Sequence, residues 1–230
     1  MSWPSVTPLV ATMPLQLSVD PVWFVAVAVV VFLAGAIVGP LLVVSLRETR
    51  QPTPDERDRL DGLGGVDSDP NWVLITEAAD DSVEVSIRGP PGRRFLLLSE
   101  SVLDELNAET AAALIAAEQA RSRHLYIEYR AVAAASVIGL ATGMFGGLFE
   151  FSDGLFLLSV SALGLFWVGR RLQFRADRVA ADQIGGEALA SAFETVAARQ
   201  GVDPETATWR TWFEVQPPLG QRIARLRDRS

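Results

Sequence analysis

Apolar residues are gathered into two long blocks, and both blocks predict helices that cross a membrane. Residues 21–46 contain no charged side chain, and at about 1.5 Å per residue they can span a hydrocarbon core of about 30 Å. A second apolar region, residues 131–170, is interrupted at Glu150, Ser152 and Asp153, which predicts a transmembrane hairpin. The alternative for this region is a buried helical hairpin in a soluble domain. The pattern therefore predicts an integral membrane protein with about three transmembrane helices.

Arginines beside the apolar blocks predict which side of the membrane each polar part occupies. They flank the first block and both ends of the hairpin, at Arg47, Arg50, Arg121, Arg123, Arg130, Arg170, Arg171, Arg175 and Arg178. Because cytoplasmic loops carry an excess of Arg and Lys, we expect residues 1–20 to form an extracytoplasmic tail and both soluble parts to be cytoplasmic. The expected location is the cell membrane, with a multi-pass topology and the N-terminus outside.

The polar parts predict a mainly helical domain with a small sheet. Residues 47–70 are charged and rich in Gly and Pro, so we expect a flexible tether. Three strand-like runs follow, at residues 72–78, 82–88 and 94–100. An alanine-rich helix opens at Asn107, so residues 71–130 are expected to hold the sheet and this helix. Residues 171–230 predict a second helical half, and the expected fold class is mainly α with a small antiparallel sheet (α+β).

Composition excludes several kinds of site. The absence of cysteine excludes a disulfide framework, a thiolate metal site and a cysteine nucleophile. A single histidine excludes any site that needs two imidazoles from one chain. The net charge of −8 argues against binding to nucleic acid, which depends on neutralising phosphates. All basic residues are arginine, and an acidic chain without lysine is typical of a salt-adapted source.

Three segments of the chain carry a resemblance to a known family. They are LLLSESVLDELNAETAAALIAAEQARSRH, RRLQFRADRVAAD and QPPLGQRIARL, with the apolar hairpin between the first and the second. In this order and spacing, the region from about residue 70 to 230 resembles the HtpX-like membrane zinc metalloproteases, relatives of the CAAX prenyl endopeptidases. The resemblance implies a gluzincin-like cytoplasmic domain, zinc as the cofactor and metalloendopeptidase activity.

The same resemblance places the zinc ligands of the family on residues that cannot replace them. Where the family has His-Glu-x-x-His, this chain has Ala117, Glu118 and Arg121, and the family's glutamate ligand corresponds to Gln173. Alanine has no donor atom, arginine is permanently cationic and a neutral amide is a poor zinc ligand. Gln216 also stands where the family often has histidine. We therefore expect no cofactor, no bound metal and no enzymatic activity, with Glu118 as a vestigial general-base position.

The remaining polar residues predict a substituted site. Arg121 follows Glu118 by three residues and shares its helix face, and Asp177 matches an aspartate near the family's site. We expect the Arg121 guanidinium to take the place of the cation and to pair with Glu118, Asp177 or both. The alternative is an ordinary solvent-facing pair of Glu118 and Arg121. His124 is expected to be a structural histidine, and the alternative is a metal ligand together with Glu118 and Asp177.

The expected function is that of a catalytically inactive relative, a pseudoprotease that acts as a membrane scaffold or regulator in membrane-protein quality control. Its expected partners are the lipid bilayer and either membrane-protein clients or an active protease, and no nucleic acid. Two alternatives stay open: an active membrane metalloendopeptidase with atypical ligands, and a membrane-anchored interaction module.

Overall fold

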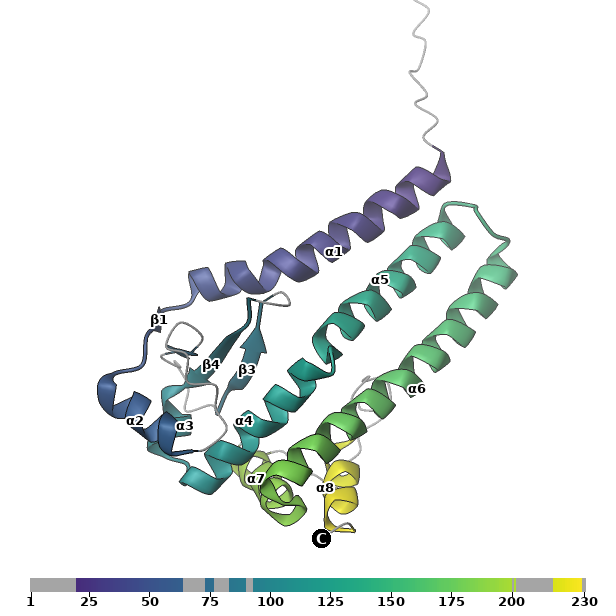
Figure 1. Ribbon diagram of the computed structural model, residues 1–230. Coiled ribbons are helices and arrows are strands. Elements are labelled where there is room, and N and C mark those ends of the chain that lie inside the picture. Colours follow the sequence, from purple (N-terminus) through teal and green to yellow (C-terminus); the bar gives the residue numbers. More distant parts are fainter. Residues whose placement is uncertain are drawn as a thin grey trace, which may run out of the picture.

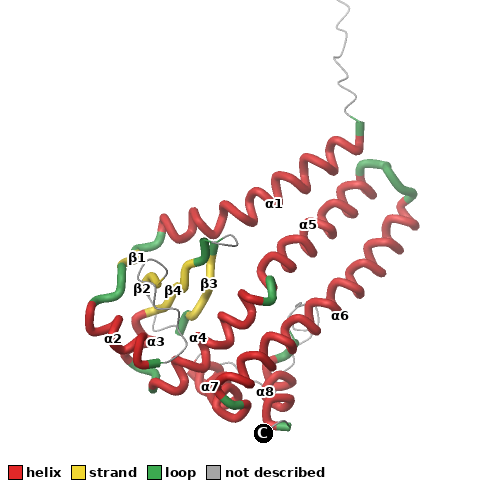
Figure 2. Tube along the Cα trace, viewed as in Figure 1, coloured by secondary structure: helices red, strands yellow, loops and turns green. Residues whose placement is uncertain are grey.

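The computed structural model describes residues 20–63, 73–76, 83–89, 93–199, 201 and 217–228. Its elements in chain order are α1 (Pro21–Leu46), β1 (Thr49–Arg50), α2 (Pro54–Gly62), β2 (Val73–Thr76), β3 (Val85–Arg88), β4 (Phe95–Ser99), α3 (Glu100–Asp104), α4 (Ala108–Arg123), α5 (Tyr126–Phe145), α6 (Phe151–Ile184), α7 (Gly186–Arg199) and α8 (Leu219–Arg227). The helices α1, α5 and α6 lie side by side as an elongated arm, and the sheet and shorter helices form a body at one end of it (Figure 1, Figure 2).

The sheet is mixed, so the prediction of an antiparallel sheet is wrong in one pairing. Its strand order is β1-β2-β4-β3, with β1–β2 and β3–β4 antiparallel but β2–β4 parallel. The strand β4 is an almost continuous apolar run, Phe95–Ser99, and four of its five residues are buried. Such a run is typical of an interior strand, whereas β3 alternates polar and apolar residues and lies at the edge. The antiparallel pairing of β3 with β4 agrees with the expected antiparallel sheet.

Part of the predicted tether is ordered. Residues 54–62 form α2, where the Thr53 hydroxyl accepts from the Glu56 amide and the Glu56 carboxylate accepts from the Thr53 amide, in a capping box. Pro54 stands at the first helical position, where its fixed φ suits a helix. The strand β1 joins the sheet just before it. Charge and Pro content suggested mobility here, but the Thr-Pro-Asp-Glu run encodes a helix start.

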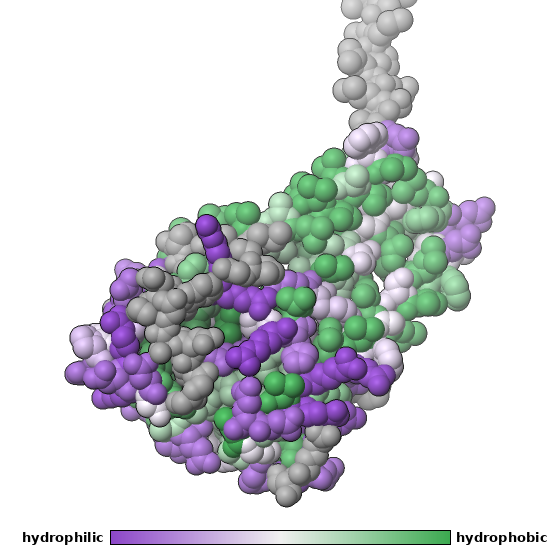
Figure 3. All heavy atoms as spheres, in the orientation of Figure 1, coloured by the Kyte–Doolittle hydropathy of each residue, from purple (hydrophilic) through white to green (hydrophobic). Residues whose placement is uncertain are grey.

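The membrane prediction holds in a coarser form. Among the described residues, α6 is the single helix long and apolar enough to cross a membrane by length and composition, not three as expected. The apolar stretch found in α1, Pro21–Ala36, is shorter, and α5 carries Glu128 and Arg130 within its first two turns. Large apolar side chains are nevertheless exposed on all three helices, and Figure 3 shows them covering the arm away from the polar body.

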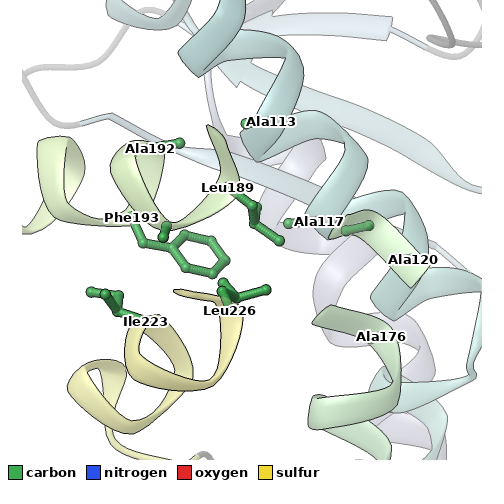
Figure 4. Close-up of a cluster of buried hydrophobic side chains, with 11 residues drawn as sticks. Ala113, Ala117, Ala120, Ala176, Leu189, Ala192, Phe193, Ile223 and Leu226 are labelled. Carbon is green, nitrogen blue, oxygen red and sulfur yellow. The ribbon is translucent and has the colours of Figure 1, made fainter. Parts of the chain in front are cut away.

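Two buried apolar clusters stabilise the body, and α4 lies between them. One side of α4 packs with Ile115 against the sheet cluster of Ile75, Leu98 and Val102. The other side packs through alanines against α6, α7 and α8, where Leu189 and Phe193 are buried with Ala176 (Figure 4). Small residues on α4 allow these helices to approach closely. The helix α4 is therefore fixed from both sides, and so are the polar side chains on it.

The helix α4 does not continue straight into α5. It opens at Asn107, whose side chain accepts from the Thr110 amide at 2.7 Å, and it ends at His124. Leu125 then adopts a left-handed conformation with φ of 53°, which is uncommon for a residue with a side chain. This break separates α4, in the polar body, from α5, in the apolar arm.

Candidate functional site

A cleft lies beside the edge strand of the sheet and is lined by two of the three resembled zinc-ligand positions, Ala117 and Arg121, but not by Gln173. Its volume is about 120 Å³, and it is lined by Val83, Val85, Leu114, Ala117, Glu118, Arg121, Phe193 and Val196. The helix α4 supplies Ala117, Glu118 and Arg121 because positions three and four residues apart share one helix face. The remaining walls come from the β3 strand with the residues before it, and from α7. Most of the wall is apolar, and Glu118 and Arg121 are its charged groups.

Glu118 is buried and both of its carboxylate oxygens are engaged. Oε2 accepts from Nη1 of Arg121 at 2.9 Å, and Oε1 accepts from the backbone amide of Ile87 at 3.3 Å. The pair does not face bulk solvent, because the side chains of Arg121 and Glu118 are only 23% and 11% exposed. Burial lowers the pKa of Arg121, and the neighbouring Arg222 charge lowers it further, while Glu118 and Asp177 oppose that shift. The arginine charge is thus held inside the cleft by two carboxylates and repelled by a second guanidinium.

A second and more deeply buried ion pair lies behind the first. Asp177 on α6 accepts from Nε and Nη2 of Arg222 on α8, both at 2.7 Å, in a bidentate pair. Gln173, one turn earlier, donates from its amide nitrogen to the same carboxylate at 2.9 Å. The Arg222 guanidinium also lies 4.3 Å from the ring centre of Phe193. The direct partners of Asp177 are therefore Arg222 and Gln173, and Arg121 acts on it only through longer-range electrostatics.

The residues present do not fit a zinc ion. Glu118 is committed to Arg121 and to a backbone amide, and Gln173 directs its amide nitrogen toward Asp177. The Oε1 atom of Gln173 is buried without a partner among the described residues, but one amide oxygen beside a guanidinium is not a site for a dication. Within the described ranges, no group of three or more His, Asp or Glu side chains is placed to hold a metal.

His124 lies apart from this arrangement. It caps the C-terminal end of α4, and its Nδ1 lies 2.8 Å from the backbone oxygen of Ala120. The alternative ligand set of Glu118, His124 and Asp177 is therefore not assembled in this part of the chain. Gln216, the other position singled out in the sequence, lies outside the described residues.

Sequence reasoning missed Arg222 as a member of the site. The residue stands in the QPPLGQRIARL segment, which carries the resemblance, but nothing in that segment alone indicates which carboxylate it meets. Residues 177 and 222 are brought together by the packing of α8 against α6. A buried aspartate requires a cationic or hydrogen-bonding partner. That requirement is the one indication that Asp177 would have an arginine such as Arg222 beside it.

Comparison with known proteins supports the fold assignment. No family model matches the sequence, and no curated protein matches it. Among solved structures, the crystal structure of S. mikatae Ste24p is similar, with a TM-score of 0.64 and 13% identity. The similarity covers 89% of this chain and 57% of the Ste24p chain. The chain thus spans a little over half the length of Ste24p, and its fold is similar to that part of the Ste24p chain.

Proposed function

We propose that this chain is a catalytically inactive, membrane-embedded relative of the HtpX-like and Ste24 metalloproteases, a pseudoprotease that binds rather than cleaves polypeptides. The fold similarity to Ste24p supports the protease ancestry. The observation that carries the loss of activity is the Arg121–Glu118 pair, which places a guanidinium at a resembled ligand position and in contact with the resembled general base.

The pair is chemically incompatible with hydrolysis. A metalloprotease needs a zinc ion to bind and polarise water, and a glutamate free to accept the proton from that water. Here Ala117 offers no ligand, and Arg121 brings a permanent positive charge that repels a second cation. Both oxygens of Glu118 already accept hydrogen bonds. The cleft therefore has neither the metal ligands nor a free base.

Embedding in the cell membrane belongs to the same proposal. The arm exposes Trp23, Phe156, Leu163 and Trp167, each at least 60% accessible, and such apolar surface on a soluble monomer would favour aggregation. Arginines follow α1 and the apolar part of α6, and the positive-inside rule then directs the polar body toward the cytoplasm. We infer that α1, α5 and α6 all cross the bilayer, with the N-terminus outside.

The proposed role is that of a scaffold or regulator in membrane-protein quality control. The strand β3 lies at the edge of the sheet beside the cleft, and an edge strand can pair with an extended peptide. Apolar walls from Val83, Val85 and Phe193 suit apolar side chains of such a peptide. The expected partners are membrane-protein clients or an active protease.

The experiment that tests this proposal compares metal content and cleavage. We expect the full chain, purified in detergent, to contain no stoichiometric zinc and to leave an unfolded substrate intact. An Ala117→His, Arg121→His, Gln173→Glu variant should bind about one zinc per chain, because it restores the donor set of the resembled site. The matched control, Ala112→His, Arg123→His, Gln183→Glu, makes the same changes outside the cleft and should stay free of zinc. Stoichiometric zinc with chelator-sensitive cleavage in the natural protein would overturn the proposal and establish the active-enzyme alternative.

A further inference from the structure

A small pocket with an unbalanced positive charge lies between α6 and α8. It is lined by Phe174, Asp177, Arg178, Arg222, Arg225 and Leu226, and its volume is about 50 Å³. This is more space than one water molecule occupies in the liquid, about 30 Å³. The pocket is separate from the cleft beside β3, and the two share no lining residue.

The charges in this pocket do not cancel. Asp177 is its single carboxylate, and the bidentate bonds from Arg222 already neutralise it. Arg178 and Arg225 make no ion pair with any described residue. The guanidinium of Arg225 lies 3.8 Å from the ring centre of Phe174, which fixes its orientation without neutralising its charge. The pocket lining therefore carries an excess of two positive charges, and that of Arg225 is oriented by Phe174.

The pocket lies where a membrane surface would be. The apolar part of α6 ends at Gly169, and Arg170 and Arg171 follow with their guanidinium groups 4.8 Å and 5.0 Å from the ring centres of Phe166 and Trp167. Phe174 is five residues beyond Gly169, about 7.5 Å along the helix axis, within the headgroup layer of about 5–8 Å on each side of the hydrocarbon core. Arg178 is about 13.5 Å beyond Gly169, so it reaches this layer through its long side chain.

The first turn of α8 lies at the same level as the end of the apolar segment. Nη2 of Arg170 donates to Oε1 of Gln221 at 3.4 Å, and Figure 1 shows α8 beside the polar end of α6. Arg171, Arg175 and Arg178 form an exposed stripe on α6 at spacings of four and three residues. A ligand that entered this pocket from the bilayer surface would thus pass along a basic face.

We propose that the pocket between α6 and α8 binds the phosphate group of an anionic phospholipid of the cytoplasmic leaflet. Guanidinium groups bind phosphate oxygens through paired, charge-assisted hydrogen bonds, and basic pockets at the cytoplasmic ends of membrane helices bind anionic headgroups. A zwitterionic lipid brings its own cation, which Arg178 and Arg225 repel. The inference rests on the membrane embedding in the proposed function, and it does not depend on the state of the zinc positions.

The test measures lipid binding to the full chain in a neutral detergent. Dioctanoyl phosphatidylglycerol is titrated against dioctanoyl phosphatidylcholine, with inorganic phosphate as a third probe, by native mass spectrometry and by the change in thermal unfolding. We expect saturable binding of phosphatidylglycerol, at least about tenfold tighter than that of phosphatidylcholine, because hydrogen bonds between charged groups are stronger than those between neutral groups. Inorganic phosphate should compete weakly, because it lacks the chains that lie along the apolar part of α6.

A pair of matched variants then locates the site. Arg178→Gln with Arg225→Gln should weaken phosphatidylglycerol binding about tenfold or more. Arg59→Gln with Arg227→Gln changes the net charge equally but removes exposed arginines whose partners are Asp104, Glu187 and Glu194, and it should leave binding unchanged.

Three results would overturn the inference. They are equal affinity for the two lipids, tight binding of inorganic phosphate alone, and equal loss of binding in both double variants. The first comparison needs no variant, so it decides the matter even if the pocket variant does not fold. A chain that purifies without detergent would refute the embedding itself. A chain that needs detergent but shows no lipid preference would refute this inference alone.

Discussion

Two arginine–carboxylate pairs occupy the interior of the body, and they differ in how much water reaches them. The side chains of Arg222 and Asp177 are 7% and 5% exposed, whereas Arg121 in the cleft is 23% exposed. An intact buried ion pair adds little to the free energy of unfolding. Removal of one partner, however, is strongly destabilising because the other charge is left buried without compensation. The two pairs also differ in what they join: Asp177 and Arg222 connect α6 to α8, whereas Glu118 and Arg121 lie on α4 and face the cleft.

The first residue-scale prediction concerns Asp177. Asp177→Asn leaves the Arg222 guanidinium buried without its counter-ion, so the free energy of unfolding should fall by about 3–5 kcal/mol. Denaturant unfolding in detergent, followed by tryptophan fluorescence, measures this loss. The control is Glu187→Gln, which removes one partner of an exposed pair with Arg227 and should cost less than about 1 kcal/mol. An equal loss of unfolding free energy in the two variants would contradict the prediction, because it would mean that water solvates the Arg222 guanidinium when Asp177 is replaced.

At the residue scale, the sequence predicted local neighbours and missed distant ones. Glu118 and Arg121 are three residues apart on one helix, so their contact follows from helix geometry alone. That Asp177 binds Arg222 and not Arg121 depends on how α8 packs, which no local spacing encodes. The assignment of Ala117, Arg121 and Gln173 to former ligand positions stays a prediction, because it rests on the family resemblance.

At the scale of elements, α5 and α6 approach closely through glycine. A Cβ on Gly154 would lie 2.6 Å from Cγ and 2.9 Å from Cβ of Met144, and the Cβ atom is fixed to the backbone, so no rotamer of Met144 relieves the whole overlap. Gly164 on the same helix has no atom within 4 Å of such a Cβ. Alanine at either glycine raises the helix propensity, but only alanine at Gly154 also crowds the contact between α5 and α6. Comparison of the two substitutions therefore separates the two effects.

Gly154→Ala should destabilise the protein by about 1–3 kcal/mol, since the added methyl group overpacks the contact between α5 and α6. Gly164→Ala should instead be neutral or stabilise the protein by up to about 1 kcal/mol, because alanine favours the helix. Thermal unfolding in detergent gives both values. If Gly154→Ala is as mild as Gly164→Ala, the two helices are less tightly packed than the structure indicates.

The elements were predicted well where one local pattern dominated and poorly where patterns competed. The helix over 21–46 follows from its apolar run, and the helix after Asn107 follows from its cap. The parallel pairing of β2 with β4 could not be read from hairpin-like spacing, because burial of the central strand decided it. The start of α2 could have been found, since Thr53 and Glu56 match a capping box, but the charged and Pro-rich composition pointed the other way.

At the scale of the whole molecule, one ion-pair cluster joins the segment after α1 to the body. The guanidinium of Arg50 donates to both oxygens of Glu56 at 2.7 Å and 2.8 Å, and to Glu100 on α3 at 2.6 Å. β1, α2 and α3 are therefore tied at one point. The cluster fixes the path of the chain from the apolar arm to the sheet.

This cluster predicts that acid weakens the attachment. The hydrogen bonds from Arg50 lower the pKa of Glu56 from 4.5 to about 2, against the opposing effect of burial. A carboxyl whose pKa is lowered on folding stabilises the protein above its unfolded pKa, and that contribution is lost as the pH falls toward the folded pKa. The shift corresponds to about 2 kcal/mol at neutral pH once the partial exposure of Arg50 is allowed for.

The measurement is the difference in free energy of unfolding between the natural chain and Glu56→Gln as a function of pH. Glutamine can still accept from the Thr53 amide, so the difference isolates the charge. It should be about 2 kcal/mol at pH 7 and decline between pH 4.5 and about 2. Asp104→Asn, at an exposed pair with Arg59, should differ little from the natural chain at neutral pH. A difference for Glu56→Gln that does not change with pH would mean that the Glu56 carboxylate is not held by Arg50. The segment after α1 would then be attached to the body by β1 pairing, by the Arg47–Glu84 pair and by the packing of Leu60, without a contribution from this cluster.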